Sequence, residues 1–269
     1  MSVLGRVVEL ELGVAGAPGV RITGLRIGFR VRHTAKPAPS EATISVYNPS
    51  PQTIALARRP DATVRLLAGY ATTTVRQVFE GAVLRDGARA VRQGPDRILT
   101  IEAADGLAGL QRTVRLSYVQ PVTVGAVLAQ VLAQTGWARG VITIEEGRSL
   151  PSGITHVGPV GPVLDRLTRG HGATWYVRDG ALYVTAIDGA VPEEAPQFSA
   201  SAGNLVGSPA PTDEGIEVTA LLDAGMRPGR RFSLVSEAYS GTYVARDVAF
   251  VGDSGWEAPF YVQVQGVVA

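Results

Sequence analysis

Apolar and polar residues alternate along the first section of the chain, residues 1–110, which is the pattern of half-buried strands. In residues 25–31 the odd positions are apolar, whereas the even positions are Arg, Gly and Arg. Residues 8–12 and 43–47 show the same alternation. Further strands are predicted at residues 63–67, 75–84 and 97–103. We expect an antiparallel sheet that closes into a small barrel, because closure removes exposed edges.

Short polar segments separate these predicted strands. Asp86-Gly87 and Gly94-Pro95-Asp96 are turn signals, and we expect each to connect two strands. Ser50 followed by Pro51 indicates the start of a short helix, since Ser caps helices well and Pro fits the first helical position. This helix should end near Pro60.

The period changes in the middle section, residues 111–190. A helix is predicted between Thr123 as its cap and Gly136 at its end, with one apolar face formed by Val124, Val127, Leu128, Val131 and Leu132. A second helix is predicted from residue 160 to Gly170. Asp179-Gly180, between two apolar segments, predicts a tight hairpin.

The last section, residues 191–269, begins in a linker and ends in strands. Residues 188–215 are rich in Gly, Pro, Ser and Ala, which is typical of a linker or extended arm. Alternation from residue 215 to 267 then predicts a second small barrel. The expected fold class is therefore mainly β with an α/β insert: two antiparallel β-barrel domains, at 1–110 and 191–269, flank a helix-containing domain at 111–190.

Composition excludes several classes of function. With 25 basic and 24 acidic residues the net charge is +1, so we expect no sequence-specific binding of nucleic acid, which requires clustered positive charge. Cysteine is absent, which excludes disulfides and thiolate metal sites. No segment has the ~18 uncharged apolar residues of a membrane helix. We expect synthesis in a cytoplasm, since the N-terminus does not resemble a signal peptide.

The segment Gly252-Asp253-Ser254-Gly255 matches part of the nucleophile signature of trypsin-like serine proteases. That chemistry needs a histidine base oriented by a buried carboxylate. Trp256 stands where the signature continues with glycine, and the sequence around His33 does not match the family. A turn is the preferred interpretation, since Gly, Asp and Ser dominate turns. A serine hydrolase using Ser254 stays as an alternative.

Other catalytic or cofactor chemistry finds no support in the sequence. The three histidines, His33, His156 and His171, are isolated from one another, so no metal site is expected. Lys36 is the only lysine and lies outside any phosphate-binding loop. We therefore expect no catalytic residue, no cofactor and no enzymatic activity.

Exposed aromatic residues are the remaining candidates for a functional surface. Trp256, beside a glycine in a loop, is the best of these, and Phe260 and Tyr261 follow it closely. Aromatic residues are enriched at the buried centres of interfaces. We take these three as candidate interface residues. A glycan-binding module is a second alternative, but 6% aromatic content is low for it.

Four stretches, in this order, resemble the baseplate hub proteins of contractile-tailed phages and related late-control and tail hub proteins. They are residues 41–50 with 64–70 and 78–83; residues 101–106; residues 125–129 with 158–167; and residues 215–222 with 227–229 and 241–243. Each stretch alone is weakly specific, whereas the ordered set covers most of the chain.

The resemblance implies a structural baseplate hub subunit in the tail of a virion. It implies a homotrimer in which each chain supplies two similar barrels, so that three chains make a ring with six similar parts. One face would meet the six-fold tail tube or its initiator proteins, and the other the three-fold central spike protein. The ring would enclose an axial channel for the tape-measure protein and DNA. No catalytic or metal residue is carried over.

Overall fold

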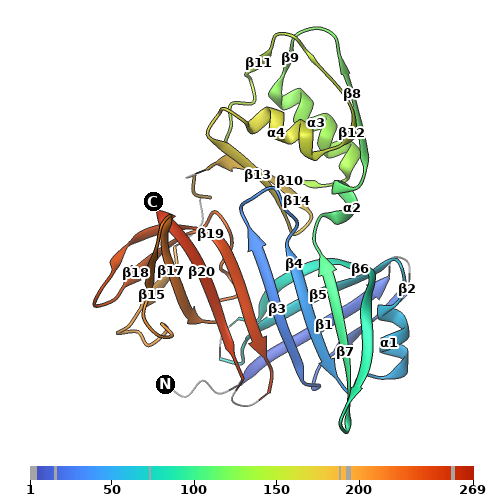
Figure 1. Ribbon diagram of the computed structural model, residues 1–269, viewed down its shortest axis with the longest axis vertical. Coiled ribbons are helices and arrows are strands. Elements are labelled where there is room, and N and C mark those ends of the chain that lie inside the picture. The colour runs from blue at the N-terminus through green and yellow to red at the C-terminus, as the bar shows by residue number, and fades with distance from the viewer. Residues whose placement is uncertain (1–4, 15–16, 73, 188, 192–194, 256–257) are drawn as a thin grey trace.

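The computed structural model describes residues 5–14, 17–72, 74–187, 189–191, 195–255 and 258–269. A large sheet fills the lower part of the molecule, and a smaller unit with two longer helices lies above it (Figure 1). The predicted fold class, mainly β with a helix-containing insert, is confirmed.

The first section supplies one edge of the large sheet. Its elements are β1 (Arg6–Val14), β2 (Ala17–Ile22), β3 (Ile27–Thr34), β4 (Glu41–Tyr47), α1 (Pro51–Ala57), β5 (Ala62–Tyr70), β6 (Arg76–Gln93), β7 (Asp96–Ala104) and α2 (Leu107–Leu110). Helix α1 begins as predicted, because the Ser50 hydroxyl accepts a hydrogen bond from the N–H of Thr53 at 3.1 Å.

The last section supplies the other edge. Its strands are β15 (Gln197–Ser199), β16 (Ala210–Thr212), β17 (Gly215–Leu221), β18 (Arg231–Val235), β19 (Ser240–Asp253) and β20 (Phe260–Val268). Two of these, β15 and β16, lie in the segment predicted to be a linker or extended arm. The pairing runs in the order β16-β17-β20-β19-β3-β4-β7-β6-β5-β1-β2, while β18 pairs with β19 and β15.

Strand β19 joins the two sections. Residues 240–244 of this 14-residue strand pair with β18, whereas residues 247–253 pair with β3 of the first section. The change of partner coincides with a register shift between Ala245 and Asp247 in the ladder with β20. A bulge of this kind bends a strand, which here lets one strand serve two neighbours.

The expectation of two separate closed barrels was wrong. Among the described residues, the strand pairs of both sections form one sheet of 13 strands. One hydrophobic core also serves both sections, with β1, β3 and β5 contributing beside β17, β19 and β20. The backbone N–H and C=O groups at the edges of β3 and β19 pair with each other, so neither section needs to close on itself to protect those edges.

The insert has its own core. Its elements are β8 (Thr113–Tyr118), β9 (Val122–Thr123), α3 (Val124–Thr135), β10 (Ala138–Ile142), β11 (Ser149–Leu150), β12 (Ile154–Pro159), α4 (Gly161–Thr168), β13 (Ala173–Arg178) and β14 (Ala181–Ala186). The apolar faces of α3 and α4 pack on these strands, as predicted from their periodicity. None of the helices that the structure describes has the length and hydropathy to span a membrane.

One predicted turn is a bulge. Asp86-Gly87 lies inside the 18-residue strand β6, with Asp86 at φ 60°. The register with β7 shifts between Val83 and Ala88. A Cβ on Gly87 would lie 2.7 Å from the carbonyl oxygen of Glu102, so the close approach of backbone requires glycine. The prediction that Asp86-Gly87 separates two strands was therefore wrong.

Candidate functional site

The loop just before Phe260 and Tyr261, which lie in β20, is attached to the first section. It joins β19 to β20, in the turn expected from its sequence. Asp253 accepts two hydrogen bonds of 3.0 Å from the guanidinium of Arg26, and the Arg6 guanidinium donates to the carbonyl of Ala258 at 2.6 Å. Charge-assisted bonds of this kind are stronger than neutral ones. They fix where the β19–β20 loop leaves the sheet.

The three candidate interface residues differ in their surroundings. Trp256 lies outside the described residues. Phe260 is 4% exposed and packs edge-on against the rings of Phe29 and Tyr70, so its ring belongs to the core of the chain. Tyr261, next along β20, is half-buried, because successive residues of a strand face opposite sides. Of the two described candidates, Tyr261 therefore has side-chain surface available to a partner, whereas the ring of Phe260 does not.

The side chain of Ser254 forms hydrogen bonds with the backbone. Its hydroxyl accepts a hydrogen bond from the N–H of Ile27 at 2.9 Å. The hydrogen bonds of His33, His156 and His171 go to residues other than Ser254. The serine-hydrolase alternative thus lacks the base contact that its chemistry needs. Nor, in the described part of the chain, do three or more potential metal ligands of the His, Asp and Glu types gather in one place.

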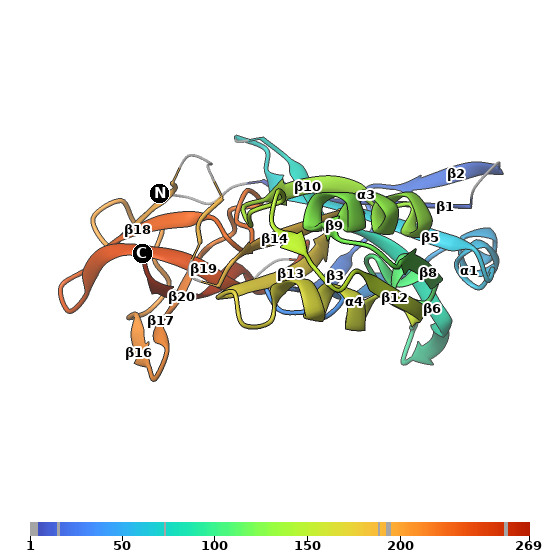
Figure 2. The ribbon, with the colours of Figure 1, turned by 90° about the horizontal axis from the view of Figure 1, so that it is seen from above.

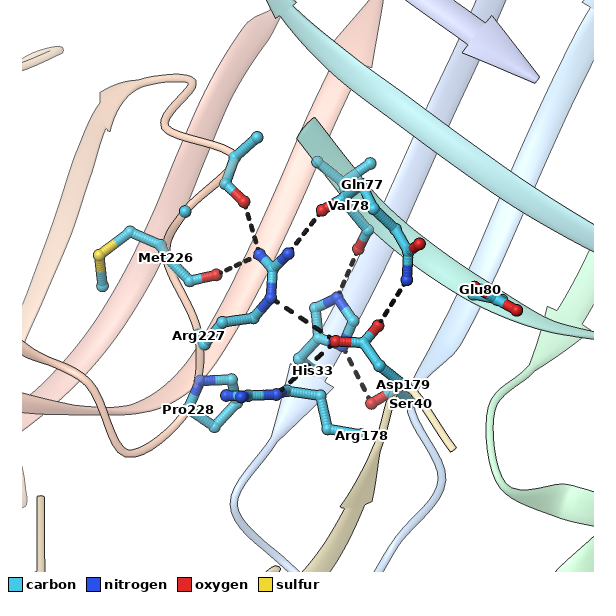
Figure 3. A network of polar contacts seen from close by, with 12 residues as sticks. His33, Ser40, Gln77, Val78, Glu80, Arg178, Asp179, Met226, Arg227 and Pro228 are labelled. Carbon is cyan, nitrogen blue, oxygen red and sulfur yellow. Dashed lines mark hydrogen bonds and ion pairs between the residues drawn. The ribbon is translucent and has the colours of Figure 1, made fainter. Parts of the chain in front are cut away.

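A connected polar cluster lies where the three sections meet (Figure 3). We call it the junction, formed by His33, Ser40, Asp105, Asp179 and Arg227. These residues come from β3, the β3–β4 loop, the end of β7, the β13–β14 hairpin and the β17–β18 loop. Sequence analysis did not identify it as a cluster.

His33 sits at the centre of the junction, 1% exposed. Its Nε2–H donates to the carbonyl of Val78 at 2.7 Å, and Nδ1 accepts from the hydroxyl of Ser40 at 3.0 Å. Val78 is free to accept because it is the residue skipped where the ladder between β5 and β6 shifts register. Burial, reinforced by the cation of Arg227, lowers the pKa of His33 to about 4. The imidazole is therefore neutral.

Arg227 ties the last section to the first. Its Nη1 donates to the carbonyls of Ala224 and Met226, at 2.6 and 2.7 Å, which holds its own loop in shape. Its Nη2 donates to the carbonyl of Gln77 on β6. The guanidinium also lies 5.9 Å from the centre of the Phe250 ring. One side chain thus connects a loop of the last section with a strand of the first.

Asp179 brings the insert into the same cluster. It occupies the tip of the predicted β13–β14 hairpin with φ 51°, followed by Gly180 with φ 68°. Its carboxylate accepts from the Gln77 amide at 3.0 Å and lies 4.0 Å from Nε of Arg227. The hairpin tip therefore contacts both other sections through one carboxylate.

Asp105 holds the hairpin from the other side. It is 4% exposed, and its carboxylate accepts from the N–H of Gly180 at 3.1 Å. Its own N–H donates to the carbonyl of Ser40 at 2.9 Å, and the hydroxyl of Ser40 bonds to His33, so Asp105 is linked to His33 through Ser40. Burial raises the pKa of Asp105 to about 6. The junction is a partly buried polar network, with His33 and Asp105 inside and Asp179 at the surface, that connects the insert to the sheet.

A comparison with known protein families finds one whose model matches this chain. A family model described as Baseplate hub gp41 matches residues 7–266, which is nearly the whole chain. A search of curated proteins finds no match.

Solved structures share the fold over almost all of the chain. A tail protein from Neisseria meningitidis MC58 superposes with a TM-score of 0.66 at 14% identity, covering 97% of this chain and 96% of that one. The 43 kDa tail protein of prophage MuSo2 from Shewanella oneidensis gives 0.67 at 10% identity, covering 97% and 96%. The E. coli c3393 protein, a component of the type VI secretion system, gives 0.64 at 10% identity, covering 96% and 76%.

Proposed function

We propose, from the premise that this chain belongs to the Baseplate hub gp41 family, that it is the subunit of a homotrimeric hub joining the six-fold tail tube to the three-fold central spike. The family makes it a structural component of a phage-type tail. The observation that carries the proposal is the family match over residues 7–266. The trimer, the two partners and the axial channel are the parts of the proposal that go beyond the family match.

The single sheet supports a symmetric adaptor. Its two sections consist mainly of antiparallel strands and share one core, so each subunit presents two β-rich parts side by side. Three subunits around an axis would then present six such parts. Closed symmetry repeats one set of contacts without leaving an open end. A rim of six parts on a three-fold body is what joins a tube and a spike of different symmetry.

The partners follow from the proposed position. One face of the ring would meet the tube or its initiator proteins, and the other the spike, while the tape-measure protein passes through the channel. The E. coli c3393 protein is described as structurally similar to T4 bacteriophage tail proteins gp27 and gp5. Another neighbour of the fold is a Francisella PdpA–VgrG complex. Both descriptions support partners at the spike side. The protein would be made in the host cytoplasm and reach the virion tail by assembly, without acting as an enzyme.

Native mass measurement tests the proposal. The chain is expressed alone and together with the spike and tube proteins of the same particle. We expect three copies per complex, with the spike or tube protein added to the trimer, since some subunits associate only with a partner present. The proposal is contradicted if the chain stays monomeric with every tail partner and particles assemble without it.

A further inference from the structure

A hollow lined by arginines lies between the end of α1 and the bulge of β6. Its volume is about 810 Å³, and Arg58, Arg59, Arg85 and Arg89 line it together with the exposed Asp86 and the partly buried Leu84 and Ala88. Residues 84–86 of this hollow lie in the bulge of β6, where the register with β7 shifts, and they line it beside residues 57–60 at the end of α1. We call this feature the arginine hollow.

Few of these cations are neutralised within the chain. Arg59 pairs with Asp61 at 3.5 Å, and Arg89 donates to a backbone carbonyl at 3.3 Å. In the described ranges, Arg58 and Arg85 form no ion pair with a carboxylate. The whole chain has a net charge of only +1, so a local excess of positive charge leaves an acidic excess elsewhere. The hollow fits an acidic protein segment, because guanidinium groups bind carboxylates in pairs of bonds.

The acidic complement is a projecting hairpin of the same chain. Thr212 of β16 pairs with Gly215 of β17, which leaves Asp213 and Glu214 as the two residues of the turn. Both are exposed, and neither forms an ion pair with a described basic residue. The hairpin projects from the end of the molecule opposite α1 and β6 (Figure 2). The strand order also places β16 at one end of the sheet and β6 toward the other.

We infer that the Asp213-Glu214 turn of one copy docks in the arginine hollow of the next copy. The two features lie on different faces, so the contact runs head to tail, and such a contact closes into a ring when the rotation is a third of a turn. Two carboxylates on a short turn match a hollow whose lining carries four guanidinium groups against one carboxylate, that of Asp86. The inference rests on the proposed trimer and identifies the surfaces that hold it.

Disulfide trapping tests the contact directly, because the chain has no cysteine of its own. The variant with Arg89→Cys and Asp213→Cys is oxidised and run on a denaturing gel without reductant. We expect a covalent trimer, since each subunit is linked to the next around the ring. The matched variant with Arg169→Cys and Asp213→Cys places one thiol on the insert and should stay uncoupled. Efficient trimer formation without any Arg89–Asp213 crosslink overturns the inference.

Charge reversal provides a second readout. Arg85→Glu with Arg89→Glu should weaken self-association by about tenfold, and adding Asp213→Arg with Glu214→Arg should restore most of it. Arg166→Glu with Arg169→Glu makes the same change of charge on the exposed surface of the insert and should have no effect. Sedimentation over a range of concentrations measures association, and thermal unfolding checks that each variant is folded.

The outcomes separate the two proposals. A wild-type chain that is monomeric with all tail partners removes the trimer and the docking contact together. A trimer that all reversals leave intact removes the docking contact alone. Reversals that abolish binding to a DNA duplex while the trimer persists would make the hollow a nucleic-acid surface, which also overturns the inference.

Discussion

Two ionisable side chains of the junction are buried, and burial moves both pKa values so that the neutral form is favoured. The pKa of His33 is lowered to about 4, with Arg227 and Arg178 adding to the shift and Asp179 opposing it. The pKa of Asp105 is raised to about 6, and Asp179 contributes to that rise. Between these values the two side chains can both be neutral. Their effects on stability then have opposite signs.

We predict that the free energy of unfolding responds to acid in opposite directions in two variants. The unfolded chain binds more protons at His33 than the folded chain between about pH 6.5 and 4, so this residue lowers stability as pH falls through that window. Asp105 binds more protons when folded between pH 3.8 and about 6, so it raises stability over the same fall. Asp105→Asn should therefore become less stable in acid relative to wild type, and His33→Gln more stable.

Urea unfolding at about pH 7 and about pH 4.5 measures both effects, each expected to be on the order of 2 kcal/mol. Wild type is the control, since its two contributions largely cancel between these conditions. The same pH dependence in wild type and both variants would show that neither side chain titrates as its burial requires.

The sequence contained part of this site. The alternation that predicts a strand at residues 25–31 continues to His33, whose odd position places it on the same inward face as Phe29 and Val31. A buried histidine could therefore have been predicted. Its partners could not, because Val78 is 45 residues away and accepts only where the ladder between β5 and β6 shifts register.

At the scale of elements, three of the four Asp-Gly dipeptides in the sequence lie wholly within the described residues, and each has a different role. Asp179-Gly180 forms the tight hairpin that its sequence predicts. Asp86-Gly87 forms a bulge inside one strand, and Asp105-Gly106 joins β7 to α2. The local preference for positive φ is the same in all three places. The partner strand decides whether the chain reverses there or continues, and the pairing partner of β6 lies beyond the reach of a local pattern.

Gly106 provides an element-scale prediction, because it starts the path into the insert. Its φ is 70°, and an added Cβ would lie 2.6 Å from Cγ1 of Val177 on β13. Gly106→Ala combines the backbone penalty with a clash against a buried side chain, so we expect a loss of about 2–3 kcal/mol of stability.

Gly94→Ala is the matched control, since Gly94 has φ 60° but no atom within 4 Å of the added Cβ. It should lose only the backbone penalty of about 1 kcal/mol. Chemical unfolding of both variants makes the comparison. Equal losses in the two variants would mean that Val177 moves aside without cost and does not fix the start of the insert.

At the scale of the whole molecule, sequence distance and structural distance disagree. Residues 1–110 and 191–269 are separated by the whole insert, yet they share one core and one sheet. The insert, residues 111–190, packs its own core. We propose that the boundaries near residues 110 and 190 separate two units that unfold independently, and that the two flanking sections unfold together. The strand pattern alone could not reveal this, because the pairing of β3 with β19 joins residues more than 200 positions apart.

Hydrogen exchange of the full chain tests this organisation with two matched substitutions. Val248 on β19 and Val131 on α3 are both fully buried, one in each core. Each change to alanine should cost about 2 kcal/mol. Val248→Ala should lower amide protection in β4 of the first section as well as in β17 of the last, while α3 keeps its protection. Val131→Ala should lower protection in α3 alone. If Val248→Ala affects β17 but leaves β4 unchanged, the first and last sections unfold separately despite the shared sheet, because β19 then transmits no stability to β3.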